Sequence, residues 1–264
     1  MADFASYHVL GNDYLVVDRA DFPRTADAAR LVCDRRRGVG ADGVLLPTWV
    51  DGVPAVRIFN ADGSECGRSG NGLIILARHL REAGVVPSGH LTVRTATGPA
   101  DVWIGDDLSV QVSLGPFRAR DPQRLDVDAT VVDVTTVDIG TPHCVAFGSP
   151  SAARRLGPLL VAYPGFEQRH NVEFVAVPGR DTLDAEVWER GAGYTPASGA
   201  GAAAAAVAAR VRGLVDPVVS VRMPGGTVRV EVADEVRLTG RASATAVGQL
   251  AADLLADLGV ARHA

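Results

Sequence analysis

Two short phrases of similar composition each precede an apolar run, and they lie about half a chain apart. Ser69-Gly70-Asn71-Gly72 opens a run that ends at Leu80, and Ser198-Gly199-Ala200-Gly201 opens an alanine tract that reaches Ala209. A helix that is apolar nearly all round must be buried. We therefore expect two central helices, each surrounded by strands from its own half of the chain.

The glycine-rich starts of these helices have a chemical consequence. The first backbone N–H groups of a helix lack partners within it, and the helix dipole adds to their ability to bind an anion. Two such starts facing each other would hold a carboxylate from both sides, flanked by the hydroxyls of Ser69 and Ser198. The simpler alternative is that each serine only caps its helix, the default role of serine at that position.

Charge and apolar content limit the partners. The chain has 264 residues and a net charge of −5, which argues against nucleic acid or an anionic membrane as its main partner. The run Arg35-Arg36-Arg37 is too short to change this and is typical of a solvated helix end. No stretch approaches the 18 or more apolar residues that a membrane span requires.

The start of the chain and the cysteines point to one compartment. Residues Met1–Ser6 show no features of a signal peptide. The three scattered cysteines, Cys33, Cys66 and Cys144, suit a reducing environment better than a disulfide framework. We therefore expect a cytoplasmic protein.

Missing residue types exclude several chemistries. All 26 Lys and Arg residues are arginine, so the chain has neither the Schiff-base lysine of a pyridoxal phosphate enzyme nor the lysine of a P-loop. No CxxC or HExxH pattern is present either. We expect no metal site and no cofactor.

Short β-branched runs, separated by Gly, Pro and Asp, predict that each half consists of several strands around its helix. The tail Ala244–Leu258 has apolar residues at helical spacing, and Pro116–Pro122 is the best linker between the halves. We expect an α+β fold of two pseudo-symmetric domains, residues 1–116 with a C-terminal helix over 244–264, and residues 117–243. The predicted strands are Tyr14–Asp18, Gly43–Leu46, Ala55–Phe59, Leu91–Thr95, Asp101–Ile104, Val110–Leu114, Val131–Val137, His143–Phe147, Val172–Val177, Leu183–Trp188, Val218–Met223 and Thr227–Val232.

Several phrases along the chain, in order, resemble the diaminopimelate epimerase family. The resemblance covers nearly the whole length and implies two domains, each a curled, antiparallel-rich sheet around a central helix, with the active site in the cleft between them. The matching phrases begin at Gly11, Arg37, Phe59, Gly140, Asn171 and Trp188, and read GNDY, RGVGADG, FNADGSE, GTPHCV, NVEFV and WERGAG.

The same resemblance exposes a difference at the reacting centre. In the family, each central helix begins with a cysteine; one removes the α-proton and the other reprotonates the opposite face. Here Ser69 and Ser198 occupy both positions. A serine hydroxyl ionises far above neutral pH, and a helix dipole shifts its pKa by too little to make it a general base. The two-thiol mechanism therefore cannot operate in this chain.

The rest of the family's substrate site is mostly retained, and the substrate is expected to be a small amino acid with two charged ends. Arg190 would pair with a distal carboxylate and Glu189 with a distal ammonium. Thr141 stands where the family usually has asparagine, and Tyr194 where it has glutamate, which makes diaminopimelate itself uncertain. The resemblance implies side-chain contacts from Asn12, Asn60, Thr141, Asn171, Glu189 and Arg190, and backbone N–H contacts from Gly70, Asn71, Gly199 and Ala200.

Three interpretations of the serines stay open. The chain is a divergent isomerase with another base or a bound water, an epimerase inactivated by an engineered Cys→Ser pair, or a binding protein without turnover. His143 is a candidate replacement base because it titrates near neutrality, although a structural role suits its place in the family better. Tyr194 and the run Leu73–Leu76 also differ from the residues usual in the family, and these differences favour the divergent isomerase. A homodimer is left open.

Overall fold

The computed structural model describes residues 3–191 and 193–260, and the chain divides into two compact units. Unit 1 comprises the residues up to Val112 together with those from Gly240 onward, and unit 2 comprises Ser113–Thr239. In the described part of the chain, no helix has both the length and the apolar composition of a membrane span.

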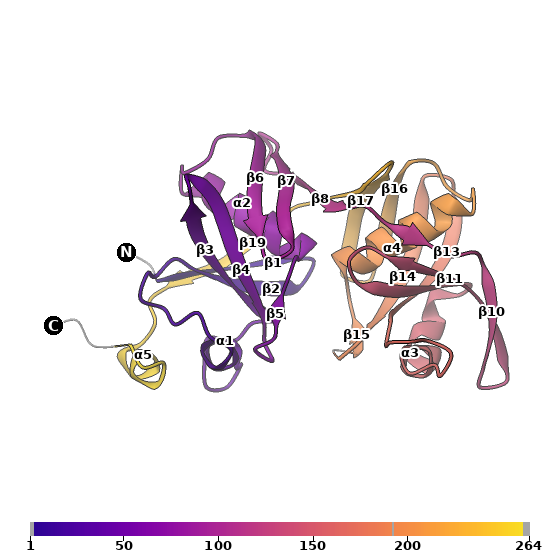
Figure 1. Ribbon diagram of the computed structural model, residues 1–264, viewed down its shortest axis with the longest axis horizontal. Coiled ribbons are helices and arrows are strands. Elements are labelled where there is room, and N and C mark those ends of the chain that lie inside the picture. The colour runs from indigo at the N-terminus through magenta and orange to yellow at the C-terminus, as the bar shows by residue number, and fades with distance from the viewer. Residues whose placement is uncertain (1–2, 192, 261–264) are drawn as a thin grey trace. The chain divides into compact units, whose positions relative to one another are not determined.

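Unit 1 is a mixed sheet that curls around helix α2 (Figure 1). Neighbouring strands follow the order β19-β1-β2-β3-β4-β6-β7-β8, in which only the β2–β3 and β4–β6 pairs are parallel. Its elements are β1 (Phe4–Val9), β2 (Asn12–Val17), α1 (Ala26–Cys33), β3 (Gly43–Val50), β4 (Val53–Asn60), β5 (Glu65–Cys66), α2 (Gly70–Glu82), β6 (Gly89–Thr95), β7 (Gly98–Ile104), the first residues of β8 (Val110–Gly115), β19 (Ser243–Gly248) and α5 (Ala252–Asp257).

Unit 2 repeats this plan around helix α4. Its strands follow the order β10-β11-β12-β13-β14-β16-β17-β18, and the parallel pairs are β12–β13 and β14–β16. Its elements are β9 (Arg118–Ala119), β10 (Gln123–Val127), β11 (Thr130–Asp138), β12 (Pro142–Phe147), a 3-10 turn (Pro150–Ala152), α3 (Ala153–Val161), β13 (Asn171–Gly179), β14 (Thr182–Glu189), β15 (Gly193–Thr195), α4 (Gly199–Val211), β16 (Val218–Met223), β17 (Gly226–Val232) and β18 (Val236–Gly240).

The register makes the two units equivalent residue by residue near their helices. On the first parallel pair, Tyr14 lies opposite Gly43 in unit 1 and His143 lies opposite Asn171 in unit 2. Each parallel pair is joined through a helix, α1 in one unit and α3 in the other. This agreement supports an internal duplication and defines which residues of the two units to compare.

The central helices are buried as expected. Residues Leu73–Ala77 of α2 and Ala202–Ala209 of α4 have no exposed surface. Because sheet strands surround each helix, every face of it is covered, which explains why the apolar residues extend all round rather than along one stripe.

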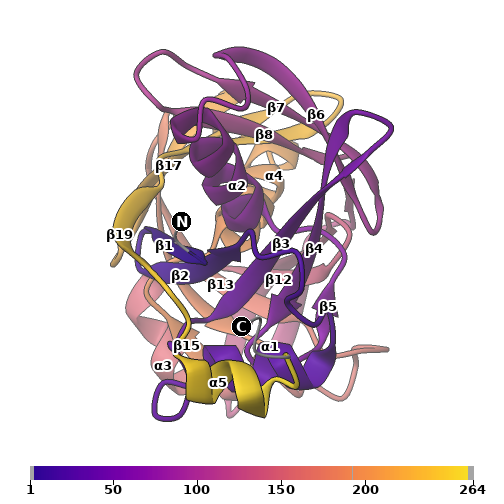
Figure 2. The same cartoon turned by 90° about the vertical axis from the view of Figure 1, so that its left-hand side faces the viewer.

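The predicted tail helix over 244–264 is wrong. Residues Ser243–Gly248 form strand β19, which hydrogen-bonds along β1, and the helix covers only Ala252–Asp257. The helical spacing is real only from Leu250 onward, and the short helix α5 lies beside α1 (Figure 2). There Leu254, Leu255 and Leu258 pack against a buried cluster that includes residues of α1. Upstream, backbone pairing with β1 overrides the side-chain pattern, and Val247 stays 71% exposed. Residues 261–264 lie outside the described part.

The linker prediction at Pro116–Pro122 needs a smaller correction. Arg118 and Ala119 within it form the short strand β9, which pairs with β11. The twelve predicted strands are all present. Strands β1, β5, β10, β15 and β18 and the connecting helices α1 and α3 were not predicted.

Candidate functional site

Ser69 caps helix α2. Its backbone is extended (φ −130°, ψ 123°), its Oγ accepts the N–H of Gly72 at 3.1 Å, and its carbonyl accepts the N–H of Leu73 at 2.9 Å. Among the described residues, no acceptor faces the N–H groups of Gly70 and Asn71. These two donors are free to bind an anion.

Ser198 caps helix α4 in the same way. Its backbone is extended (φ −142°, ψ 122°), and its Oγ accepts the N–H of Gly201 at 3.2 Å. Within the part of the chain that the structure describes, the N–H groups of Gly199 and Ala200 have no acceptor. Ser198 is 6% exposed, so it is more enclosed than Ser69. The capping hypothesis is confirmed for both serines, and contact with a ligand stays a prediction.

Three polar side chains gather at the α2 start. Asn71 donates through Nδ2 to Oδ1 of Asn12 at 2.9 Å, and the Tyr14 hydroxyl lies 3.4 Å from Oγ of Ser69. The buried Oδ1 of Asn71 accepts no hydrogen bond from the described residues. Asn60 instead donates to Ser64 within its own turn, at 2.9 Å.

An arginine that the sequence suggested was solvated holds this region in place. Arg35 donates to both carboxylate oxygens of Asp13, at 3.0 and 2.6 Å, and to Asp42 at 2.9 Å. Asp42 also accepts from Nδ2 of Asn12 at 3.1 Å. Partial burial acts to raise the pKa of Asp13, but hydrogen bonds from Arg35 and the Asp42 region outweigh it, and the pKa is lowered. Arg35 therefore fixes the loop that carries Asn12.

The predicted residues of unit 2 meet at one edge of its sheet. Thr141 precedes the first residue of β12, Asn171 begins β13 and Glu189 ends β14. Arg190 donates its backbone N–H to Oδ1 of Asn171 at 2.9 Å, and its exposed guanidinium reaches the carbonyl of Arg169 at 3.3 Å. The fold thus brings together four residues that lie up to 49 positions apart in the sequence.

Beneath the α4 start lies a buried ion pair that includes one residue not predicted. Nδ1 of His143 is 2.8 Å from Oε1 of Glu173, and the two side chains are 1% and 0% exposed. The other ring nitrogen, Nε2, is 2.9 Å from Oγ1 of Thr141. Glu173 lies within the NVEFV phrase that begins at Asn171. Its place two residues after Asn171 on a strand, hence on the same face, was the signal for its role.

The comparison with known families decides where this chain belongs. The family model for diaminopimelate epimerase matches residues 4–119 and 135–245. Diaminopimelate epimerase 2 of Nostoc sp. is 38% identical, over 96% of this chain and 97% of the relative. The diaminopimelate epimerase of Desulforudis audaxviator is 40% identical, over 88% and 92%. The chain belongs to the diaminopimelate epimerase family.

Solved structures share the fold of this family member at low sequence identity. A PhzF-family phenazine biosynthesis protein of Bacillus anthracis matches with a TM-score of 0.74 at 15% identity, over 93% of this chain and 97% of that one. A hydroxyproline epimerase of Agrobacterium vitis, solved with bound trans-4-hydroxy-L-proline, matches with a TM-score of 0.71 at 17% identity, over 95% and 92%. The α+β fold of two duplicated domains is thereby confirmed.

Burial raises the pKa of all three thiols of this epimerase-family chain. Burial raises the pKa of Cys66, the thiol nearest Ser69 in sequence, and its Sγ donates to the Arg68 carbonyl at 3.1 Å. Burial also raises the pKa of Cys33 to about 12, and that of Cys144 further still. These thiols are protonated at neutral pH and are poor nucleophiles. No metal-binding cluster occurs among the described residues.

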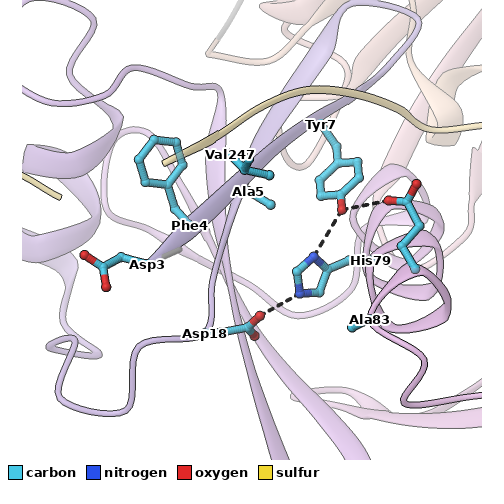
Figure 3. A pocket seen from close by; sticks show the side chains of 9 residues that line it. Asp3, Phe4, Ala5, Tyr7, Asp18, His79, Ala83 and Val247 are labelled. Atoms are coloured by element: carbon cyan, nitrogen blue, oxygen red, sulfur yellow. Dashed lines mark hydrogen bonds and ion pairs between the residues drawn. The ribbon is translucent and has the colours of Figure 1, made fainter. Parts of the chain in front are cut away.

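A pocket of about 280 Å³ lies at the other end of α2, away from Ser69 (Figure 3). The Tyr7 hydroxyl donates to Glu82 at 3.0 Å and lies 3.2 Å from Nδ1 of His79, whose Nε2 contacts Asp18 at 2.6 Å. Burial and the bond to Glu82 raise the pKa of Tyr7. At 1.5 Å per residue, the α2 C-terminus is roughly 20 Å from its start, so this pocket is separate from the predicted carboxylate site.

Proposed function

We propose that this protein is a cofactor-independent isomerase that acts at the α-carbon of an amino acid with a second charged group. The observation that carries this proposal is the duplicated helix start. Each unit has a capping serine followed by two backbone N–H groups with no acceptor among the described residues. Each such site can bind a carboxylate oxygen.

A carboxylate bound in this way sets the position of the α-carbon. The carbon is one bond from the carboxylate, so it would lie within reach of the serine that caps the helix binding it. Donors directed at the carboxylate also stabilise the negative charge that develops when the α-proton leaves, which is the largest contribution in many such reactions.

The sheet edge of unit 2 supports a second charged group on the substrate. The exposed guanidinium of Arg190 can pair with a distal carboxylate in a bidentate manner, and Glu189 can pair with a distal ammonium. The names of the Nostoc and Desulforudis relatives point to diaminopimelate, which has charged groups at both ends. Tyr194 stands where the family usually has glutamate, so we propose a related substrate of different length or shape.

The proton-transfer group cannot be either serine. Each Oγ already accepts a backbone N–H, and among the described residues no hydrogen bond joins it to a histidine or carboxylate that could take its proton. His143 contacts Glu173, which lies under the first turn of α4, and we propose His143 as the source of basicity.

One observation favours a second candidate, an amino-acid-binding protein without turnover. Both serines cap their helices, which a binding site needs as much as an enzyme does. The two candidates differ only in whether the α-proton moves.

Proton exchange in deuterated water separates them. The protein is incubated with diaminopimelate, amino acids with a distal charge, and alanine, and loss of the α-proton is followed by ¹H NMR. An isomerase exchanges the α-proton of the doubly charged amino acids at least tenfold faster than that of alanine. Arg190→Gln should raise KM for these substrates, whereas Arg180→Gln, at an exposed ion pair with Asp216, should not. Binding without exchange supports the second candidate, and absence of both contradicts each proposal.

A further inference from the structure

We propose that Thr141 is a catalytic residue, and that Thr141, His143 and Glu173 form a proton relay that replaces the thiol missing from unit 2. This inference rests on the proposed isomerase function and identifies the group that moves the proton. It is carried by the geometry of the three side chains and by the comparison with unit 1.

The hydrogen-bond pattern assigns the direction of the relay. An ionised carboxylate can only accept, so Nδ1 of His143 carries the hydrogen that Glu173 accepts at 2.8 Å. Nε2 then has a free lone pair, and the hydroxyl of Thr141 donates to it at 2.9 Å. A hydroxyl, an imidazole and a carboxylate joined in this order are the arrangement that activates hydroxyl groups in enzymes.

Burial leaves one route into the relay. His143 and Glu173 are 1% and 0% exposed, whereas Thr141 is exposed at the sheet edge it shares with Asn171. The threonine hydroxyl is therefore the exposed end of this hydrogen-bonded chain. The Glu173 carboxylate also lies under the first turn of α4, because a Cβ on Gly201 would meet its Oε1 at 2.9 Å.

Unit 1 shows that the fold does not require this pair. By register, Asn12, Tyr14 and Leu45 stand where unit 2 has Thr141, His143 and Glu173. Under the first turn of α2, a Cβ on Gly72 would meet Cδ2 of Leu45 at 3.2 Å, the contact that Glu173 makes in unit 2. Burying a polar pair where an apolar residue also fits gives little or no stability. The pair in unit 2 therefore has a chemical role.

The proposed step conserves atoms and charge. The Cα–H bond of the substrate breaks, its electron pair stays on the substrate, and the proton passes to Oγ1 of Thr141. The original hydroxyl proton of Thr141 passes at the same time to Nε2 of His143, which becomes an imidazolium stabilised by Glu173. The reverse transfer delivers a proton to the carbanion, so neither oxidant nor reductant is needed.

Variants at the exposed Thr141 test the relay with little risk to folding. We expect Thr141→Val to lower kcat for α-proton exchange by a factor on the order of 10²–10⁴, with KM changed by less than about threefold. Thr141→Ser should stay within tenfold of the original chain because it keeps the hydroxyl. Thr141→Asn, which introduces the residue usual in the family, should lower kcat for α-proton exchange to the same extent as Thr141→Val. Thr227→Val, at an exposed threonine on β17, is the matched control.

A pH profile distinguishes a relay from a hydrogen-bond anchor. Protonation of Nε2 should stop the relay, so the exchange rate falls on the acid side. Glu173→Gln should move this acid limb to lower pH, because it removes the charge that favours the imidazolium. His90→Asn, at the exposed His90–Asp101 pair, should leave the limb in place. If Thr141 only anchors the substrate by a hydrogen bond, Thr141→Val should raise KM, and Glu173→Gln should leave the acid limb of the pH profile unchanged.

The outcomes are distinct. Loss of exchange in Thr141→Val, retention in Thr141→Ser and a shifted acid limb in Glu173→Gln support the relay. Exchange in Thr141→Val within threefold of the original chain overturns the relay and leaves the isomerase function standing. Absence of exchange in the unmodified chain, with every doubly charged amino acid, overturns the proposed function and the relay with it.

Discussion

Units 1 and 2 fold alike but differ beneath the first turn of their central helices. Both have a capping serine, and both have a glycine three residues later that leaves room for a buried side chain. That side chain is Leu45 in unit 1 and Glu173 in unit 2. The serine and glycine are therefore requirements of the helix start itself, whereas the residue beneath the turn is free to vary with function.

The largest expected effect comes from giving unit 1 the charge of unit 2. Leu45 is fully buried, and Leu45→Glu would place a carboxylate beside Tyr14 with no cationic partner. We expect the free energy of unfolding to fall by about 3–5 kcal/mol. Leu45→Met should cost less than about 1.5 kcal/mol. Urea unfolding measures both.

The double variant Tyr14→His/Leu45→Glu sharpens this test. It recreates in unit 1 the imidazole–carboxylate pair of unit 2, so the two changes should couple favourably by about 0.5–3 kcal/mol. Additive effects would show that the two positions are not equivalent and would contradict the comparison.

The two glycines provide the next prediction. Gly201→Ala would bring a Cβ within 2.9 Å of the buried Oε1 of Glu173, whereas Gly72→Ala meets Leu45 at 3.2 Å. We expect Gly201→Ala to destabilise the protein by about 1–3 kcal/mol. Gly72→Ala should be near neutral, because alanine gains roughly 1 kcal/mol in helix propensity. Equal losses in urea unfolding would show that Glu173 does not limit the space.

The capping serines should behave alike. Ser69→Ala and Ser198→Ala each remove the acceptor of one backbone N–H, so each should cost about 1 kcal/mol. Thermal denaturation should show Tm lower by about 2–4 °C for each variant. Ser69→Asn, which keeps a capping acceptor, is the control. A loss confined to one serine would mean that the other is held by something besides its cap.

The smallest effect concerns acid stability in unit 1. The pKa of Asp13 is lowered below its ordinary value of 3.8, so its contribution is present above that pH and is lost as the pH falls through the lowered value. Arg35 is 59% exposed, so Arg35→Met should cost less than about 1 kcal/mol at pH 7 and reduce the acid dependence. Arg36→Met is the control. Urea unfolding at pH 7 and pH 3 would contradict this account if Arg35→Met and Arg36→Met behave alike.

Local patterns in the sequence were enough to predict the central helices and twelve strands, because burial on all sides and β-branched runs leave a strong signal. The tail was misjudged because pairing with β1 depends on residues more than 230 positions away. Strand β10 has exposed side chains at Gln123, Arg124 and Asp126, and such a mixed pattern does not distinguish a strand from a loop.

The site was predicted only in part, because some of its residues lie in continuous motifs and others are brought together by the fold. The capping serines and the Arg190 edge follow from motifs that are continuous in sequence. Glu173 gains its role from a strand neighbour 30 positions earlier, and Arg35 from carboxylates in two separate loops. Sequence spacing alone does not place these groups together, since strand order and register do so.

The central claim is that proton transfer depends on the relay of Thr141, His143 and Glu173 in unit 2. It does not depend on the residues at the corresponding positions of unit 1, Asn12, Tyr14 and Leu45. The most direct measurement is the initial rate of α-deuterium incorporation from deuterated water into the best doubly charged amino acid, compared for Thr141→Val and Tyr14→Phe. We predict a loss on the order of 10²-fold or more for Thr141→Val and less than tenfold for Tyr14→Phe. An equal or larger loss for Tyr14→Phe would contradict the claim.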